Sequence, residues 1–297
     1  MTPPVGPWTA RVAPPDLAAV RAIVAGALAE DRAGFDVTTL ALVPAEQSGR
    51  GDLVFREPGV ICGLDVAREV FAALSPALTF EPLYGDGAFV EGGTLVARVS
   101  GPLAPMLSGE RVALNLMQRM SGIATATRRY VVAASEGGRA RVVDTRKTTP
   151  GLRVLERYAV RVGGGHNHRN TLEDGVLIKD NHLAAAARRG LTMHDVVRAA
   201  RSHAPHTMRI EVEVDTAEQA REAIAAGADV VLLDNMSPAA MHAIVEASPG
   251  GCLFEASGGI TLETIRAVAA SGVDVISSGA LTHSTPALDI ALDLEAT

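Results

Sequence analysis

The feature that most constrains the fold is a regular alternation of short apolar runs and amphipathic segments over roughly the last 160 residues. Apolar residues spaced about 3.6 apart predict helices, and continuous apolar runs next to Gly predict buried strands. The run AAGADVV at 225–231 recurs as ASGVDVI at 270–276, 45 residues later. Each copy places Gly where a helix ends and a strand begins. This alternation predicts a parallel sheet covered by helices on both faces.

We assign the elements of this region from the same pattern. The predicted strands cover 141–143, 176–178, 210–214, 230–233, 252–254 and 273–276. The predicted helices cover 192–202, 217–226, 238–247 and 262–270. About six such units favour an α/β barrel somewhat smaller than the usual eight-unit form. An open, doubly wound sheet is the alternative.

The first part of the chain has a different texture. Residues 16–30 have helical spacing, with Asp16 as a candidate N-cap. From 49 to 101, short β-like runs lie between Gly and Pro turns, with a helix predicted over 66–74. A long helix is predicted over 108–129. With 297 residues, the chain is long enough for about two domains, the first of them α+β.

Charge and composition exclude several classes of protein. The chain has 34 acidic and 27 basic residues, a net charge of -7, which argues against nucleic-acid binding. Its 2 cysteines, Cys62 and Cys252, form no disulfide framework and suit a reducing cytosol. No apolar run is long enough to span a membrane, and the N-terminus lacks the features of a signal peptide. We therefore expect a soluble, cytoplasmic protein.

Polar residues follow the predicted strands at the edge where chemistry lies in such folds. Ser257-Gly258-Gly259 and Ser278-Gly279-Ala280 follow the last two strands and resemble phosphate-binding turns, because Gly lets the backbone approach an anion. An ordinary βα turn is the alternative for each.

Four cations flank the predicted strand ends, where Arg side chains suit carboxylates and Lys suits phosphate. They are Arg146, Lys147, Arg169 and Lys179. Single surface charges are the ordinary interpretation of each residue, but four near one edge predict a site for anions.

Acidic and imidazole side chains lie at the same edge. Glu213 and Asp234 are candidates for ribose hydroxyls or Mg²⁺, which prefers few carboxylates together with substrate phosphates. Glu211 and Glu213 share one face of their strand, and a structural ion pair with neighbouring Lys or Arg is the alternative. A zinc site at His166, His168 and His182 matches known ligand spacing poorly, and a hydrogen-bonding role for His168 is favoured.

Six long runs carry a resemblance to a known family. They are GERVALNLMQRMSGIAT (109–125), DTRKTTPGLRVLERYAVRVGGGHNHRNTLEDGVLIKDNH (144–182), EVEVD (211–215), LLDN (232–235), EASGGI (255–260) and SSGALT (277–282). Together with EDRAGFDVTTLALVP (30–44), they closely resemble quinolinate phosphoribosyltransferase, also called carboxylating nicotinate-nucleotide pyrophosphorylase.

The resemblance implies an incomplete, about seven-stranded α/β barrel with an N-terminal α+β, sandwich-like domain. We place the N-terminal domain at 1–114, with a Pro-rich arm at 1–15, and the catalytic barrel at 115–281. We expect a C-terminal helix at 282–297 that packs back on the N-terminal domain. The implied assembly is a homodimer or a dimer-based hexamer in which Arg111 reaches the partner's site.

The implied activity is a pentosyltransferase reaction in NAD biosynthesis. Quinolinate and phosphoribosyl pyrophosphate, with Mg²⁺, give nicotinate mononucleotide, pyrophosphate and CO₂. Lys147, Glu213 and Asp234 are the implied catalytic residues, and the two carboxylates are also the implied Mg²⁺ ligands, partly through phosphate and water. The implied substrate-binding residues are Arg111, Thr145, Arg146, Lys147, His168, Arg169, Lys179, Glu213, Asp234, Ser257, Gly258, Gly259, Ser278, Gly279 and Ala280.

Three other functions remain as alternatives. A relative with this fold could use another substrate, such as nicotinate, but the several cations favour a dicarboxylate, since a monocarboxylate leaves positive charge unpaired. A phosphate-binding isomerase or aldolase would need Lys179 desolvated as a Schiff base, yet Asp180 follows it directly. A non-catalytic binding protein is disfavoured by Glu213 and Asp234 together with the basic cluster.

Overall fold

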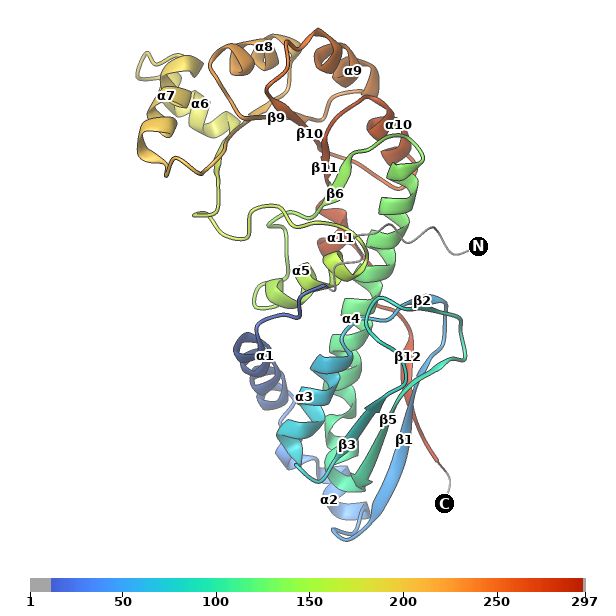
Figure 1. Cartoon of the computed structure of the whole chain (residues 1–297). Helices are drawn as coiled ribbons and strands as arrows, with labels where there is room; N and C mark the ends of the chain where they lie inside the picture. Colours follow the sequence, from blue (N-terminus) through green and yellow to red (C-terminus); the bar gives the residue numbers. More distant parts are fainter. Residues whose placement is uncertain (1–11, 296–297) are drawn as a thin grey trace. The chain divides into compact units, whose positions relative to one another are not determined.

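The computed structural model describes residues 12–295, which form two compact units. The first contains residues up to Thr125, Thr149–Gly163 and the segment from Pro286 onward. The second contains Ala126–Thr148 and Gly164–Thr285. Helix α4 (Leu103–Ser135) contributes residues to both (Figure 1). No helix among the described residues is long and apolar enough to cross a membrane.

The first unit is built on an antiparallel sheet with strand order β12-β1-β5-β3. These strands are β1 (Ser48–Phe55), β3 (Thr79–Pro82), β5 (Leu95–Pro102) and β12 (Ile290–Leu294), and β2 (Gly59–Val60) pairs separately with β4 (Phe89–Val90). The helices are α1 (Leu17–Glu30), the 3₁₀ helix η1 (Ala33–Phe35), α2 (Val37–Leu42), α3 (Leu64–Leu74) and α5 (Arg153–Val162), besides the first part of α4. Asp16 caps α1 as predicted, accepting a hydrogen bond from the Ala19 amide at 3.0 Å.

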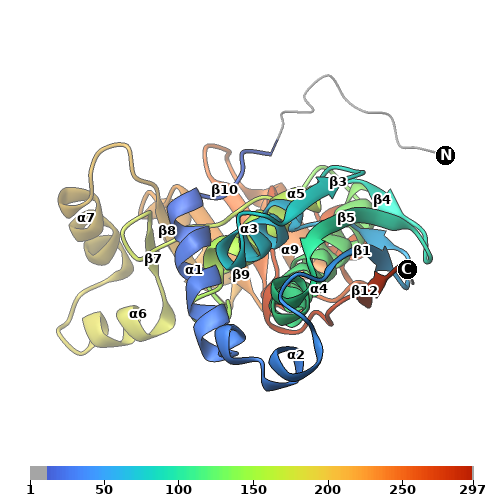
Figure 2. The ribbon, with the colours of Figure 1, turned by 90° about the horizontal axis from the view of Figure 1, so that it is seen from below.

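Alternate side chains of β1 enter the core of this unit. Leu53 and Phe55 are fully buried. On α3, Val70 is fully buried and Phe71 is almost fully buried. Helix α1 lies beside α3 in both views (Figures 1 and 2). The burial follows from sequence spacing, since residues two apart on a strand share a face.

The second unit is built on a parallel sheet with strand order β6-β11-β10-β9-β8-β7. Its strands are β6 (Arg141–Val143), β7 (Val176–Ile178), β8 (Ile210–Val214), β9 (Val230–Asp234), β10 (Leu253–Ser257) and β11 (Val275–Ser277). Its helices are α6 (Asp180–Ala187), α7 (Met193–His203), α8 (Ala217–Ala225), α9 (Pro238–Ala247), α10 (Ile265–Ala270) and α11 (Ala280–His283). Helices α8, α9 and α10 lie outside the curved row of strands (Figure 1).

The α/β class and the alternation predicted for this unit are confirmed. Strands β6, β7 and β8 have the predicted bounds, and β9, β10 and β11 differ by 1 to 3 residues at an end. The expected count of about seven strands is not reached, because the described residues form a sheet of six. A seventh position is present only as an isolated parallel bridge between His166 and Val143 of β6. The residues on either side of His166 are too rich in Gly and polar side chains to extend that bridge into a strand.

The C-terminal helix expected at 282–297 is wrong. Helix α11 ends at His283, and Ile290–Leu294 form β12, which pairs antiparallel with β1. Leu288, Ile290, Leu292 and Leu294 alternate with other residues, and this period of two fits a strand. Edge pairing with β1 outweighs the helical preference of Ala and Leu. The last two residues lie outside the described chain.

The boundary expected at 114/115 is also wrong, because it falls inside the continuous helix α4. The compact units divide at Thr125, and Thr149–Gly163, expected in the barrel, belongs with the first unit. There the buried Glu156 of α5 accepts hydrogen bonds from Arg119 of α4 at 2.9 and 3.1 Å. The Pro-rich arm at 1–15 lies largely outside the described residues.

Gly122 on α4 provides a test of this packing. A Cβ atom there would lie 2.2 Å from the backbone oxygen of Pro286, which leads into β12. We expect Gly122→Ala to lower the free energy of unfolding by about 1–3 kcal/mol, as overpacked sites do. The control is Gly26→Ala on α1, where nothing lies within 4 Å and alanine should stabilise by about 0.5–1 kcal/mol. Urea denaturation at fixed protein concentration compares them, and equal effects would contradict the packing.

Candidate active site

A cavity of about 430 Å³ opens at the carboxyl ends of the parallel strands. Every strand of the six-stranded sheet, or the loop directly after it, contributes to its wall. The lining residues are Thr145, Arg146, Lys147, His168, Arg169, Leu177, Lys179, Glu213, Leu232, Asp234, Glu255, Ser257 and Ser277. The fold therefore brings together nine of the residues predicted for the second unit's site, from Thr145 to Ser257, in one place.

The loop after β6 is organised by a buried carboxylate. Asp144 directly follows Val143 and is fully buried. It accepts hydrogen bonds from Asn167 Nδ2 at 2.6 Å and from the His168 amide at 2.8 Å. Because a buried charge needs such donors, Asp144 holds the segment that carries His168 against the end of β6.

Lys179 is placed by the turn from β7 into α6. It is the N-cap residue of α6, and its amide donates to His182 Nδ1 at 2.9 Å. Its Nζ lies 2.6 Å from Glu213 Oε2 on β8. The lysine side chain is 44% exposed, so it is a solvated, paired cation rather than the desolvated amine that Schiff-base chemistry requires.

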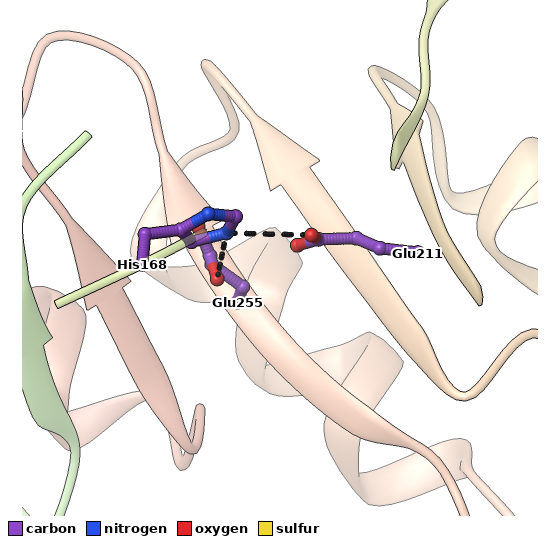
Figure 3. Close-up of side chains that lie close together, drawn as sticks. All are labelled: His168, Glu211 and Glu255. Atoms are coloured by element: carbon purple, nitrogen blue, oxygen red, sulfur yellow. Dashed lines mark ion pairs between the residues drawn. The ribbon is translucent and has the colours of Figure 1, made fainter. Parts of the chain in front are cut away.

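His168 lies between two buried glutamates (Figure 3). Its Nε2 is 3.3 Å from Glu211 Oε2 on β8 and 3.3 Å from Glu255 Oε2 on β10. Burial alone would lower the pKa of His168, but hydrogen bonds to these carboxylates and their charges raise it to about 10. Burial raises the pKa of Glu211, while the hydrogen bond from His168 opposes that shift. The ring is therefore an imidazolium at neutral pH.

A backbone hydrogen bond connects the carboxyl ends of β9 and β10. Asn235 has a left-handed backbone with a φ of 55° and donates through Nδ2 to Asp234 Oδ2 at 2.7 Å. Its amide donates to the Ser257 carbonyl at 3.0 Å. A Cβ on Gly258 would meet Asn235 Oδ1 at 2.3 Å, and the φ of Gly258 is 87°. Glycine is required in this turn both for its conformation and for the close approach.

The second predicted phosphate turn is more enclosed. Ser278 is buried, and its hydroxyl donates to the Ile260 carbonyl at 3.4 Å. Ser277, which was not predicted, lines the cavity instead. A Cβ on Gly279 would lie 2.8 Å from Lys147 Cδ, so glycine leaves room for that lysine. The Lys147 carbonyl accepts a hydrogen bond from Thr282 Oγ1 at 2.7 Å.

Two arginines complete the basic wall. Burial lowers the pKa of Arg169, and the nearby charge of Arg146 lowers it further. Arg169 Nη1 donates to the Gly175 carbonyl at 3.2 Å. The Nε of Arg146 is buried and has no hydrogen-bond partner within residues 12–295. Close, partly desolvated guanidinium groups of this kind are stabilised by an anionic ligand.

Arg111 belongs to the other unit. It lies on α4 with its side chain 59% exposed, and it lines a cavity of that unit with Phe35, Val37 and Ser108 among others. Arg111 is thus the one predicted carboxylate-binding residue that does not lie in the second unit.

Glu255 is a charged site residue that the sequence analysis did not predict. It stands in the apolar strand run Leu253–Ser257, is 3% exposed, and pairs in register with Leu232. A carboxylate in the middle of a buried strand was the available signal, since such a charge needs a partner. Glu211 carried the same signal on β8. The three-histidine zinc interpretation finds no support among the described residues, because His168 clusters with glutamates and His182 binds a backbone amide.

The geometry defines a class of protein. A covered parallel sheet places arginine, lysine and imidazolium side chains around a cavity at its carboxyl edge, next to two carboxylates and a glycine turn. The chemistry of this arrangement is suited to small polyanionic ligands and to group transfer that develops charge.

Comparison with known proteins names the family. A model of the quinolinate phosphoribosyl transferase C-terminal domain matches residues 123–293, and the N-terminal domain model matches residues 36–121. The chain belongs to this family. It is 45% identical over 265 residues to a probable carboxylating nicotinate-nucleotide pyrophosphorylase of Bacillus subtilis, covering 89% of this chain and 90% of the relative. A carboxylating nicotinate-nucleotide pyrophosphorylase of Mycobacterium leprae is 44% identical, and the match covers 93% of this chain and 97% of the relative.

Solved structures agree in fold. The nicotinate-nucleotide pyrophosphorylase of Francisella tularensis superposes with a TM-score of 0.87 at 36% identity, covering 94% of this chain and 96% of that one. Human nicotinic acid phosphoribosyltransferase gives a TM-score of 0.57 at 17% identity, which shows a shared fold only. The family, the enzyme class and the transferase function predicted from the sequence are confirmed.

The His168 cluster predicts a pH dependence of stability. Its folded pKa of about 10 exceeds the ordinary value of 6.5, so its contribution is complete below pH 6.5 and lost as pH rises through about 10. We expect the stability difference between the native chain and His168→Gln to shrink from pH 6.5 to 9.5, by at most about 1.4 kcal/mol per pH unit. Denaturation curves at fixed protein concentration measure it, and a difference that widens with pH would contradict the assignment.

Proposed function

We propose that this chain transfers the phosphoribosyl group of phosphoribosyl pyrophosphate to quinolinate and releases pyrophosphate and CO₂, with the second-unit cavity as its active site. The observation that carries the assignment is the set of cations around that cavity: Arg146, Lys147, His168, Arg169 and Lys179. Quinolinate presents two carboxylates and phosphoribosyl pyrophosphate presents several phosphate charges, so both substrates compensate this cluster. Family membership supports the same reaction.

The cations divide between the substrates by their chemistry. Arg146 and Arg169 offer planar forks for the quinolinate carboxylates, and His168 and Lys179 add charge at the same wall. Lys147 lies on the loop after β6 beside Gly279, where it meets both substrates. The Ser257–Gly259 turn takes phosphate through backbone amides, with Ser278, Gly279 and Ala280 in a supporting role and Thr145 at the edge.

The nucleophile of this reaction is the pyridine nitrogen, which carries no proton to remove. Catalysis by the protein is therefore largely orientation, and clamped carboxylates supply it. As pyrophosphate leaves, positive charge develops on the ribose, and the carboxylates of Glu213 and Asp234 stabilise it. These side chains also suit the ribose hydroxyls. Loss of CO₂ then uses the pyridinium as an electron sink.

The same two carboxylates fit Mg²⁺. They are hard oxygen donors on adjacent strands, few in number, as Mg²⁺ prefers when phosphate oxygens and water complete its shell. When bound, Mg²⁺ neutralises the departing pyrophosphate. Glu213 pairs with Lys179 at 2.6 Å and Asp234 accepts a hydrogen bond from Asn235 at 2.7 Å, so both carboxylates are held in place at the strand ends.

The assembly we propose is a homodimer, or a dimer-based hexamer, in which Arg111 completes the partner's site. Its support is an apolar surface beside Arg111 on the first unit. Phe35, Val37, Leu40 and Leu42 are 69–78% exposed, which is unusual for large apolar side chains on η1 and α2. A second copy of this chain would bury them.

We place the enzyme in the cytoplasm, in keeping with its acidic composition and its two unpaired cysteines. Relatives from Arabidopsis thaliana and Nicotiana tabacum are described as chloroplastic and mitochondrial. Fractionation of cells that express the chain with a C-terminal tag tests this placement.

The substrate assignment is tested directly. With phosphoribosyl pyrophosphate and Mg²⁺, the purified chain should convert quinolinate to nicotinate mononucleotide and release one CO₂ per turnover. Nicotinate should be a poor substrate, because one carboxylate leaves a cation unpaired. Chromatography of the product and trapped ¹⁴CO₂ provide the measurement, with enzyme lacking Asp234 (Asp234→Ala) as the control. Turnover of nicotinate alone would overturn the proposal.

Shared sites are tested by mixing inactive subunits. Arg111→Ala and Lys147→Ala proteins, unfolded together and refolded, should regain roughly a quarter of native activity, because half the dimers are mixed and each mixed dimer has one intact site. The control mixes Arg111→Ala subunits with subunits that carry both Arg111→Ala and Lys147→Ala. In this mixture every site lacks Arg111. Activity in the control would show that the site does not need Arg111. No activity in verified mixed dimers would show that Arg111 acts in its own subunit.

A further inference from the structure

The carboxylates of Glu211 and Glu255 form a buried clamp around His168, and no role in the reaction described above requires them. Glu211 is 7% and Glu255 is 3% exposed. They come from β8 and β10, with β9 between them, so the clamp spans three strands. Both Oε2 atoms lie 3.3 Å from the same ring nitrogen (Figure 3). Each Oε1 is buried and has no hydrogen-bond partner in the described part of the chain.

This arrangement is costly unless a cation occupies it. Two ionised carboxylates that share one site repel each other, and each loses its hydration on burial. Carboxylates only accept hydrogen bonds, so Nε2 of His168 must carry the proton that both share. Two further charged groups act on this cluster: Asp144 accepts a hydrogen bond from the His168 amide, and the charge of Arg169 lowers the pKa of Glu211. The charge of the ring thus offsets the carboxylates.

The clamp also fixes the direction of the ring. With Nε2 committed to two acceptors on separate strands, rotation about the side-chain bonds would break at least one contact. The opposite edge of the imidazolium is then the edge that a ligand in the cavity can meet. Glu→Gln substitution would keep the size of each side chain and one acceptor oxygen but remove the charge that holds the ring protonated.

We propose that Glu211 and Glu255 are positioning residues, which hold His168 as a fixed imidazolium so that it binds one carboxylate of the dicarboxylate substrate. The inference rests on the proposed function for the identity of that substrate. It assigns the two glutamates an effect through His168 rather than through contact with the reacting atoms. It also separates them from Glu213, which lies two residues after Glu211 on β8 and pairs with Lys179.

A divalent metal is the competing occupant. The ligand atoms of His168, Glu211 and Glu255 all lie within 4.8 Å of one another, the one such group of three among the described residues. A metal would have to displace the shared proton, and the hydrogen bonds that raise the His168 pKa to about 10 oppose this. We therefore favour the proton over a metal at this position.

Kinetics provide the first test. In Glu211→Gln, Glu255→Gln and the double variant, the KM for quinolinate should rise about tenfold or more, as for loss of a charged hydrogen bond. The KM for phosphoribosyl pyrophosphate should change less than about twofold. Glu246→Gln, an exposed change on α9, is the matched control and should leave both values unchanged. Equal rises in both KM values would overturn a role specific to His168.

Histidine-selective ¹⁵N NMR provides the second test and needs no activity. At pH 8 the ring of His168, assigned with His168→Gln, should show two protonated nitrogens in the native chain and one in the double variant. A neutral ring in the native chain would overturn the clamp. The clamp would also be overturned if the native chain bound one Zn²⁺ or Mn²⁺ per chain and the double variant bound none. Absence of quinolinate turnover together with a charged ring would overturn the proposed function alone.

Discussion

The site depends on charge compensation across the floor of the parallel sheet. The sheet brings the carboxyl ends of six strands to one edge, and charged residues on or after those strands then neutralise one another in pairs: Lys179 with Glu213, and His168 with Glu211 and Glu255. Without these carboxylates the basic wall would repel itself in the absence of substrate.

Much of the second unit could be predicted because its signals are local. Short strand-like runs predicted β6, β7 and β8 to the residue, and the Pro238–Ala247 helix follows its Ser237 cap. The C-terminal segment could not be read in the same way. Its Ala and Leu content favours a helix, while the partner that makes it a strand, β1, lies more than 230 residues earlier. The period of two in this segment fits a strand, but nothing in its sequence identifies β1 as the partner.

The residues of the candidate site likewise differ in whether a local sequence signal predicts them. Residues at strand tips, such as Lys179 and Asp234, could be placed because the end of an apolar run marks the functional edge. Glu255 could not, because its function depends on a histidine 87 positions away in the sequence that becomes its neighbour only in the fold. Net charge was equally uninformative about the cavity. A total of -7 describes the whole chain, whereas ligand binding depends on the few charges within a Debye length of the site.

The pairing of β12 with β1 has a consequence for how the molecule is made. Synthesis on the ribosome proceeds from the N-terminus, so β1, β3 and β5 are available long before Ile290–Leu294 leave the exit tunnel. During that interval β1 is an open edge strand, exposed to pairing with other nascent chains. The parallel sheet, whose strands all lie between residues 141 and 277, needs nothing from the last segment and can form earlier. The first unit to be translated is thus the last to be completed.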